Sequence, residues 1–334
     1  MVHKYSGMRV LFVASGRIGG VGHVVRNQGD SLANTGTEVD YFLIHPGLTG
    51  YLRDIPRLRR VAEQERYDIV HAHYSLSGFV ATLAGCRPLI VSLMGSDIFM
   101  SGLVRVLIRF LHRRRWSATI VKTRQMSETL RIKGSFIIPN GVDLSRFRPL
   151  PMDEARKHVG LPPDKKIVIL ISITEKRVKN IELASAAVRQ LNDPGIDFRI
   201  VRGVPNEEIP FYLNAADVMI LSSKWEGSAN VIKEAMACNC PVVSTDVGDA
   251  EWVMKGVRGC YVTPLSKGEL SDAVRKAIQF SSRTTGRQRI IDLKLGSDAV
   301  AEKLRRLYET VHNGDQPHDT LQPDDFALHG ELPN

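Results

Sequence analysis

Two glutamates, eight positions apart, are the residues of this sequence best placed to bind a ligand. Glu226 opens a small-residue loop, 226–229, after the strand-like run 218–221, and Glu234 lies inside the helix expected over 230–237. A loop at the mouth of a parallel sheet, followed by a helix start, offers free N–H groups and a positive dipole end to an anion. The spacing alone fits two solvated glutamates on a βαβ crossover more often than a binding site.

The elements that must position these glutamates alternate between strand and helix along the chain. Apolar strand-like runs occur at 9–14, 39–44, 69–72, 89–93 and 119–122, and again at 167–173, 198–201, 218–221, 242–244 and 259–262. The pattern predicts an α/β fold of two doubly wound parallel-sheet domains facing a central cleft. We expect an N-terminal domain at 1–148 and a second domain at 149–297, with a Pro-bearing linker at the start of the second. A helix over 298–312 should pack back toward the N-terminal domain, and residues 313–334 should form a flexible tail.

The composition is globular, with 43% hydrophobic and 24% charged residues over 334 positions. No apolar run approaches the roughly 18 to 20 residues that span a bilayer, and the N-terminus lacks the apolar segment of a signal peptide. The four cysteines have no metal-ligand spacing, so we expect buried free thiols in a reducing, cytoplasmic compartment and no metal site. They are Cys86, Cys238, Cys240 and Cys260.

Positive charge is concentrated in the first half. Residues 1–150 hold 21 Lys and Arg against 10 Asp and Glu, whereas residues 151–334 hold 24 against 26. A basic half fits nucleic acid, an anionic membrane surface or a phosphorylated substrate. Because no zinc-finger, RNA-recognition or helix-turn-helix signature accompanies it, we expect no nucleic-acid partner.

Several ordered segments together resemble glycosyltransferase family 4, whose members have the two-domain GT-B fold and use nucleotide-sugar donors. Gly19 and Gly20 follow the first strand and resemble the family's N-terminal glycine loop. The other matching segments are 68–73, 138–143, 178–180, 215–218 and 226–235. The likeness covers about residues 8–310, and the stretch 209–249 looks closest to bacterial surface-polysaccharide and teichuronic-acid-type enzymes.

The resemblance implies roles on the donor side. Glu234 would hydrogen-bond the nucleotide ribose, Glu226 would face the sugar ring, and Lys179 and Arg177 would stabilise the charge of a leaving diphosphate. Lys176 is an alternative to Arg177, and three basic residues in a loop also fit a plain solvated surface. The loop backbone would bind sugar hydroxyls or diphosphate, through Gly227, Ser228, Ala229 and Asn230, with Gly19 and Gly20 against the phosphates. No cofactor or metal is implied beyond a UDP- or GDP-type sugar as co-substrate.

The glycine loop has a competing interpretation. Gly20-x-Gly22 after a strand, with Asp40 about twenty residues on, also fits a dinucleotide-binding turn. Val25 stands where the third glycine belongs, and Asp40 lies inside the second strand rather than at its end. An NAD site is therefore the weaker alternative, and a plain turn without ligand stays open.

His73, Asp97 and Asn140 are the candidates on the acceptor side. Met94 stands where the family commonly has a histidine, and a thioether neither donates a hydrogen bond nor shuttles a proton. Of His71 and His73 we expect at most one to face the cleft, with the other on the opposite face of the strand. For either histidine, a hydrogen-bonded place in the core is the favoured interpretation.

The stretch 103–116 reads LVRVLIRFLHRRRW and predicts a basic amphipathic helix. Its basic residues suit an anionic membrane surface, whereas a surface helix packed on the sheet is the equal alternative. They are Arg105, Arg109, Arg113, Arg114 and Arg115. Of these, we expect Arg109, Arg113 and Arg114 to point outward. With the arginines of 53–60, they suggest a lipid-linked acceptor that carries phosphate.

We therefore expect a metal-independent, retaining glycosyltransferase that moves a sugar from a nucleotide diphosphate donor to a lipid-linked or polysaccharide-precursor acceptor. It would be cytoplasmic, on the inner face of the membrane. The alternatives are a catalytically silent sugar-nucleotide-binding or scaffold protein, suggested by Met94, and a GT-B-like sugar-nucleotide epimerase.

Overall fold

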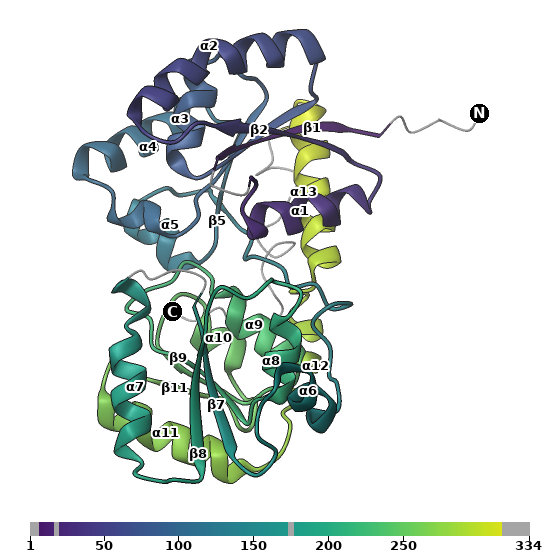
Figure 1. Ribbon diagram of the computed structural model, residues 1–334. Helices are drawn as coiled ribbons and strands as arrows, with labels where there is room; N and C mark the ends of the chain where they lie inside the picture. Colours follow the sequence, from purple (N-terminus) through teal and green to yellow (C-terminus); the bar gives the residue numbers. More distant parts are fainter. Residues whose placement is uncertain (1–6, 17–19, 173–176, 316–334) are drawn as a thin grey trace. The chain divides into compact units, whose positions relative to one another are not determined.

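The computed structural model describes residues 7–16, 20–172 and 177–315, and it divides into two compact units. The first unit combines the chain up to Gly141 with the segment that begins at Ser297, and the second runs from Val142 to Gly296. In Figure 1 the purple and blue strands and helices belong to the first unit, the green ones to the second, and the yellow helix α13 (Ser297–His312) to the first again.

Among the described residues, six parallel strands form the sheet of the first unit, in the order β2-β1-β3-β4-β5-β6. Their bounds are β1 Arg9–Ser15, β2 Glu38–Ile44, β3 Ile69–His73, β4 Leu89–Ser92, β5 Ala118–Val121 and β6 Phe136–Ile137. Strands β3, β4 and β5 are buried along their whole length, as in a parallel sheet covered on both faces. The strand order reverses between β1 and β3, which is where open α/β sheets bind ligands.

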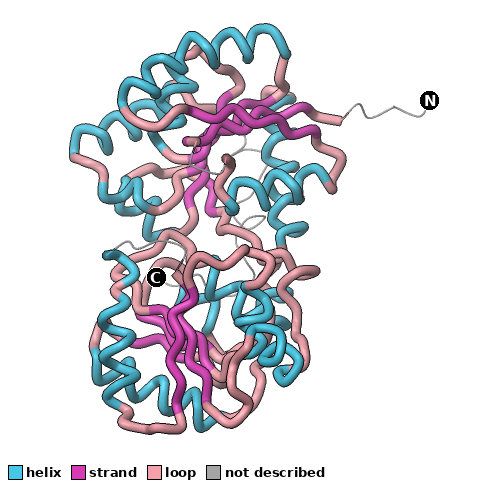
Figure 2. Tube along the Cα trace, viewed as in Figure 1, coloured by secondary structure: helices cyan, strands magenta, loops and turns pink. Residues whose placement is uncertain are grey.

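Helices cover both faces of this sheet (Figures 1 and 2). Helices α2 Leu48–Glu65, α3 Ser75–Leu83, α4 Gly102–Arg114 and α5 Arg124–Leu130 pack on one face, around Leu58, Val80, Ile108 and Met126. Helices α1 His23–Ala33 and α13 pack on the other face. There Leu304, Leu307 and Tyr308 of α13 share a core with Phe12 of β1, so the C-terminal helix is part of the first unit's core.

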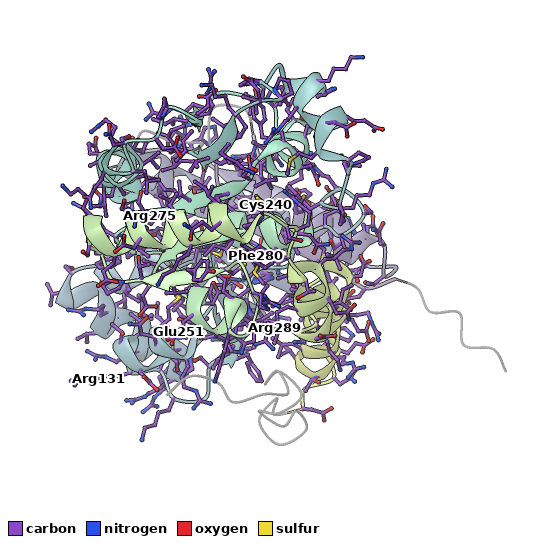
Figure 3. All side chains as sticks on the ribbon, turned by 90° about the horizontal axis from the view of Figure 1, so that it is seen from below. Arg131, Cys240, Glu251, Arg275, Phe280 and Arg289 are labelled. Carbon is purple, nitrogen blue, oxygen red and sulfur yellow. The ribbon has the colours of Figure 1, made fainter. Side chains whose placement is uncertain are left out.

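In the described part of the second unit, five parallel strands have the order β11-β10-β9-β7-β8. They are β7 Lys166–Ile171, β8 Ile196–Val201, β9 Val218–Leu221, β10 Val242–Thr245 and β11 Tyr261–Thr263. Helices α7 Ile181–Gln190 and α11 Lys267–Phe280 cover one face. The other helices are α6 Met152–Val159, α8 Ile209–Ala215, α9 Asn230–Ala237, α10 Ala250–Met254 and α12 Gly286–Asp292. Figure 3 labels two residues of α11: Arg275, which pairs with Asp272 on the exposed side, and Phe280, whose ring lies under Arg258.

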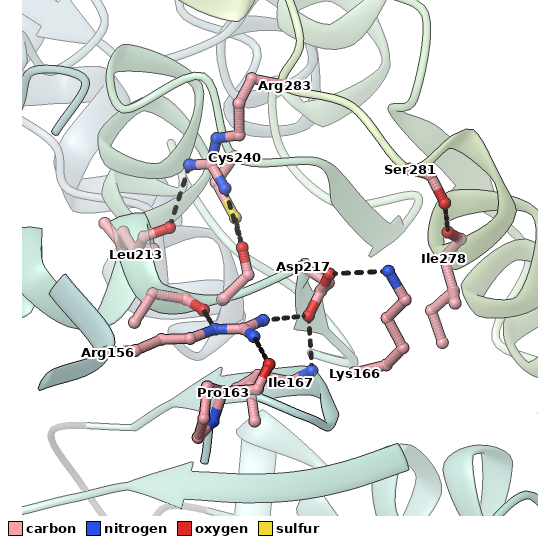
Figure 4. A network of polar contacts seen from close by, with 12 residues as sticks. Arg156, Pro163, Lys166, Ile167, Leu213, Asp217, Cys240, Ile278, Ser281 and Arg283 are labelled. Carbon is pink, nitrogen blue, oxygen red and sulfur yellow. Dashed lines mark hydrogen bonds and ion pairs between the residues drawn. The ribbon is translucent and has the colours of Figure 1, made fainter. Parts of the chain in front are cut away.

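Polar contacts fasten the N-terminal edge of the second sheet (Figure 4). Arg156 of α6 donates to the Asp217 carboxylate at 2.6 Å, and the backbone N–H of Ile167 donates to the same oxygen at 2.7 Å. Asp217 immediately precedes β9 and Ile167 lies at the start of β7. This network therefore ties α6 to two neighbouring strands, at the edge opposite the loops that follow the strands.

Two expectations about the elements need correction. The first unit ends at Gly141, before the linker expected at 148–151, because Arg287 of α12 donates to the carbonyls of Leu144 and Phe147 and holds that stretch to the second unit. The sequence predicts a charged helix over 55–65, whereas α2 begins at Leu48. Gly50 and Pro56 both disfavour helix on propensity alone, yet both lie inside α2. Residues 316–334 of the expected tail lie outside the described residues.

Candidate functional site

The loops that follow β7 and β9 meet at the C-terminal edge of the second unit's sheet. The two strands are neighbours in the sheet. Ser222 Oγ contacts the backbone oxygens of Lys179 and Asn180 at 3.0 Å each, and the N–H of Lys224 donates to Val178 O at 2.8 Å. The loop that carries Lys179 is therefore fixed against the loop that carries Glu226.

Lys179 and Glu226 form an ion pair across these loops. The Nζ atom of Lys179 lies 2.7 Å from Glu226 Oε1, and Ser223 Oγ donates to the same carboxylate oxygen at 2.7 Å. The two side chains keep 22% and 18% of their surface exposed, so a ligand can reach both. The pair holds a positive and a negative group side by side, so the site offers one group that can bind an anion and one that can accept hydrogen bonds from hydroxyl groups.

The loop between Glu226 and α9 is closely packed. Gly227, Ser228 and Ala229 are buried and Asn230 is half-buried. Ala229 occupies the position before α9 and makes no side-chain cap hydrogen bond, so the positive dipole end of the helix adjoins this loop.

Glu234 lies one helical turn inside α9 and is half-buried. Desolvation raises the pKa of its carboxyl to about 7, against the opposing effect of Arg146, Lys179 and Lys233. A carboxyl that changes its charge near neutral pH, close to three cations, is a good acceptor for a ligand's hydroxyl groups once it ionises.

Sequence reasoning missed two buried charges beneath the loop. Lys233 of α9 has no exposed side-chain surface and lies 2.8 Å from Asp249, which directly precedes α10. Ser228 Oγ donates to the same carboxylate at 2.8 Å. The available signal was a lysine among the buried residues Ile232, Ala235 and Met236, where an amphipathic helix needs an apolar side chain.

The remaining donor-side candidates are less informative. Gly20 lies just after β1 in the first unit, with a positive φ of 94°. Gly19 lies outside the described residues. Arg177 begins the short 3-10 helix η2 (Arg177–Lys179), and its side chain and all of Lys176 lie outside the described part of the chain.

The expectation that His71 and His73 lie on opposite faces was wrong, because side chains two positions apart in a strand share a face. Their rings lie 4.3 Å apart, and both are fully buried. His71 bonds Ser92 Oγ at 2.8 Å and Tyr308 of α13, as a core histidine. Neither ring nitrogen of His73 has a hydrogen-bond partner, and burial beside Lys122 lowers its pKa to about 3.

Asp97 holds a turn in the first unit. Its fully buried carboxylate accepts from the N–H of Ser75 at 2.9 Å and from the N–H of Met94 at 2.6 Å. Desolvation raises its pKa despite these bonds. It therefore fixes the Met94 turn against the start of α3. Asn140 is half-buried and follows β6, so it lies at the same strand-end edge as Gly20 and His73.

Helix α4 exposes apolar as well as basic side chains. It packs inward through Ile108 and Leu111, while Leu103 is 84%, Val106 53% and Phe110 56% exposed. Arg113, Arg114 and Arg115 are exposed, whereas Arg105 and Arg109 are half-buried, so the expected outward position of Arg109 is only partly met. Within the described ranges, none of the helices is both long and apolar enough to cross a bilayer.

Two family models match most of this architecture. The model described as Glycosyltransferase Family 4 matches residues 40–146, and the one described as Glycosyl transferases group 1 matches residues 165–279. The two matches fall on the first and the second unit respectively, apart from residues 142–146.

Curated relatives share about a quarter of their residues with this chain. A putative teichuronic acid biosynthesis glycosyltransferase of Bacillus subtilis is 28% identical over 251 residues, covering 66% of this chain and 64% of the relative. A D-inositol 3-phosphate glycosyltransferase of Mycobacterium tuberculosis is 26% identical over 299 residues, covering 75% and 62%. The chain thus spans slightly under two thirds of the length of these relatives.

Solved structures show the same fold at lower identity. Sucrose-phosphate synthase from Thermosynechococcus elongatus aligns with a TM-score of 0.78 at 19% identity, covering 92% of this chain and all of that one. Anabaena HepE in complex with UDP-glucose aligns with a TM-score of 0.68 at 17% identity, covering 91% and 100%.

Proposed function

Since the chain belongs to glycosyltransferase family 4 and has the GT-B fold, we propose that it transfers a sugar, with retained anomeric configuration, from a UDP- or GDP-type donor. The observation that carries the proposal is the Lys179–Glu226 ion pair beside the uncapped start of α9. It combines, at the C-terminal edge of one sheet, a cation for a phosphate, a carboxylate for a sugar and the positive dipole end of a helix.

The reaction needs charge stabilisation above all. As the bond from the anomeric carbon to the diphosphate oxygen breaks, negative charge accumulates on the leaving nucleoside diphosphate. Lys179 and the positive dipole end of α9 stabilise that charge without a metal ion. The acceptor hydroxyl forms the new bond on the same face of the sugar, and its proton passes to the departing phosphate.

The other residues bind and orient the donor. Glu226, held by Ser223 and Lys179, accepts hydrogen bonds from sugar hydroxyls. Glu234 in its ionised form accepts the two ribose hydroxyls, since a carboxylate matches a vicinal diol.

For the acceptor we propose a lipid-linked or polysaccharide-precursor molecule at the inner face of the membrane. Helix α4 supports this, because its exposed apolar residues lie beside Arg113, Arg114 and Arg115, as in helices that bind an anionic bilayer surface. The B. subtilis relative is also named for teichuronic acid biosynthesis.

The test is the release of free UDP or GDP from a panel of nucleotide sugars, with and without membrane extract as acceptor. Acceptor-dependent release, together with a product whose anomeric configuration matches the donor by NMR, is the expected result. Binding of the nucleotide sugar without release of the nucleotide would favour a catalytically silent sugar-nucleotide-binding protein instead. Met94 suggests this second candidate, because its side chain cannot donate a hydrogen bond. Interconversion of sugars without transfer would indicate an epimerase.

A further inference from the structure

Lys233, Asp249 and Ser228 form a closed cluster under the loop that precedes α9. The ammonium of Lys233 contacts both the Asp249 carboxylate, at 2.8 Å, and the Ser228 hydroxyl. Asp249 accepts from Ser228 Oγ at 2.8 Å and from the backbone N–H of Ala229 at 3.2 Å. The Lys233 side chain is completely buried, and the Asp249 side chain is 5% exposed.

The turn that carries Asp249 lies directly against the same loop. Gly248 has a φ of +59°, and a Cβ on it would lie 3.0 Å from the carbonyl oxygens of both Glu226 and Gly227. Only glycine allows the turn to approach this closely. Two separate features, the ion pair and the glycine contact, therefore hold the loop in one position.

A buried ion pair is a poor source of stability. Removing two charges from water costs about as much as their attraction returns, and apolar residues of similar volume often replace such a pair without loss. What an apolar pair cannot do is accept hydrogen bonds from Ser228 and Ala229. The specific contribution of Asp249 is to fix the loop backbone, and Lys233 compensates its charge.

We propose that the Lys233–Asp249 pair is a positioning device that holds residues 227–230 in the conformation that binds the diphosphate and sugar of the donor. This inference rests on the proposed function, because it assigns that loop to the donor. Lys233 and Asp249 do not touch the ligand themselves; they act through Ser228 and Ala229.

The second unit contains a matched buried pair away from this loop. Arg156 and Asp217 lie 2.6 Å apart, with 10% and 13% of their side-chain surfaces exposed, at the N-terminal edge of the sheet (Figure 4). Removing that pair disturbs the same unit without touching the loops after β7 and β9. A variant without the Arg156–Asp217 pair therefore shows what a general loss of stability does to nucleotide binding when the loop itself is unchanged.

The experiment uses the full chain and compares UDP with UMP, or GDP with GMP if the wild type prefers guanine, by calorimetry. The main variant is Lys233→Met with Asp249→Leu, which removes both charges of the pair together. We expect affinity for the diphosphate to fall about tenfold or more, as for the loss of a charged hydrogen-bonding group, with monophosphate affinity unchanged.

Two further variants complete the design. Lys233→Met with Asp249→Asn keeps an acceptor oxygen for Ala229 and should recover most of the diphosphate preference. Arg156→Met with Asp217→Leu should lower the melting temperature without changing that preference. If the Met/Leu variant at 233 and 249 discriminates diphosphate from monophosphate as the wild type does, the pair is structural only and the inference fails. If the wild type binds neither UDP nor GDP, the proposed function itself fails.

Discussion

Glu234 is the residue whose titration should be easiest to detect. Its pKa is raised from 4.5 to about 7 by desolvation, so between these values the folded protein holds a proton that the unfolded chain releases. The stability that this proton binding contributes is fully present below pH 4.5 and is lost as the pH rises through 7.

Glu234→Gln removes this ionisation. We expect the melting temperature of the ligand-free variant, relative to the wild type, to be higher at pH 8.5 than at pH 5.5. The variant should also bind UDP or GDP about tenfold more weakly at pH 8.5, because a charge-assisted acceptor is lost. Thermal unfolding and calorimetry measure the two effects, and an equal difference in melting temperature at both pH values would contradict the raised pKa.

Lys179 should matter more for turnover than for donor binding, because its charge is needed most as the diphosphate departs. We expect Lys179→Ala to lower kcat about 100-fold with a much smaller change in the donor KM, measured by nucleotide release. Lys224→Ala is the matched control, since Lys224 lies two positions before Glu226 and is exposed. Loss of donor affinity at unchanged kcat would assign Lys179 to ground-state binding.

The sequence was informative where residue type and strand end coincide. The resemblance to glycosyltransferase family 4 assigned Lys179 and Glu226 to one site. Both residues follow neighbouring strands of one parallel sheet, and the carboxyl ends of such strands meet at one edge. Lys233 and Asp249 could not be paired from the sequence, because both types are normally solvated and only the packing of α9 against the turn at Gly248 brings them together. His73 shows another limit: its face relative to His71 was predicted wrongly, and its lack of a hydrogen-bond partner depends on packing that the sequence does not show.

Elements with a clear apolar period were predicted well. The sequence predicts a helix from about Lys267 to Phe280, and α11 has these bounds, because Leu270, Ala273, Val274 and Ala277 form one buried stripe. Helix α2 is longer than the predicted 55–65, and its interior holds Gly50 and Pro56, two residues that intrinsic propensity places outside helices. Helix α4 shows the reverse problem, since its apolar residues are not all buried and periodicity cannot tell which face points outward.

The exposed basic residues at the C-terminal end of α4 and the exposed apolar residues of α4 should contribute to membrane binding in different ways. Reversing Arg113, Arg114 and Arg115 to Glu should reduce binding to phosphatidylglycerol vesicles at least about 100-fold at low salt, at roughly 1 kcal/mol per basic residue. Replacing Leu103, Leu107 and Phe110 by Ser should weaken the vesicle binding that remains at high salt, because salt does not screen the burial of apolar side chains.

Cosedimentation at low and high salt measures both effects. Leu265→Ser with Ile291→Ser is the control, because these residues are 52% and 44% exposed but belong to the second unit. Equal cosedimentation of all variants would mean that α4 does not dock on the bilayer.

After the second unit, the chain returns to the first unit through α13. Contacts at both ends of the second unit hold the chain at the points where it leaves and re-enters the first. Val142 N–H donates to Leu295 O at 2.9 Å, so the ends of 142–296 are held together. A Cβ on Gly141 would lie 2.8 Å from Ser297 Cα, so the chain leaves and re-enters the first unit at one point. The amphipathic pattern of 298–312 predicted the helix. The core residues of the first unit against which the helix packs could not be read from that pattern, because they lie far away in the sequence.

This arrangement predicts how fragments behave. Residues 142–296 alone should unfold cooperatively and keep affinity for UDP or GDP, because the proposed donor residues from Lys179 to Glu234 all lie within them. Residues 1–141 alone should not fold, because they lack Leu304, Leu307 and Tyr308 of α13, which are fully buried in the first unit. Burying three such side chains is worth more than about 5 kcal/mol, comparable with the total stability of many domains.

Joining 1–141 to 297–315 through a short glycine linker should restore cooperative unfolding, since residues 141 and 297 are already adjacent. Circular dichroism during heating compares the three fragments. A joined fragment in which Tyr308→Ala accompanies Leu304→Ala should lose most of the gain, because those side chains fill the core against Phe12 and His71. If residues 1–141 alone melt as sharply and at the same temperature as the joined fragment, α13 does not complete the core, and the first unit would have to be regarded as ending at Gly141.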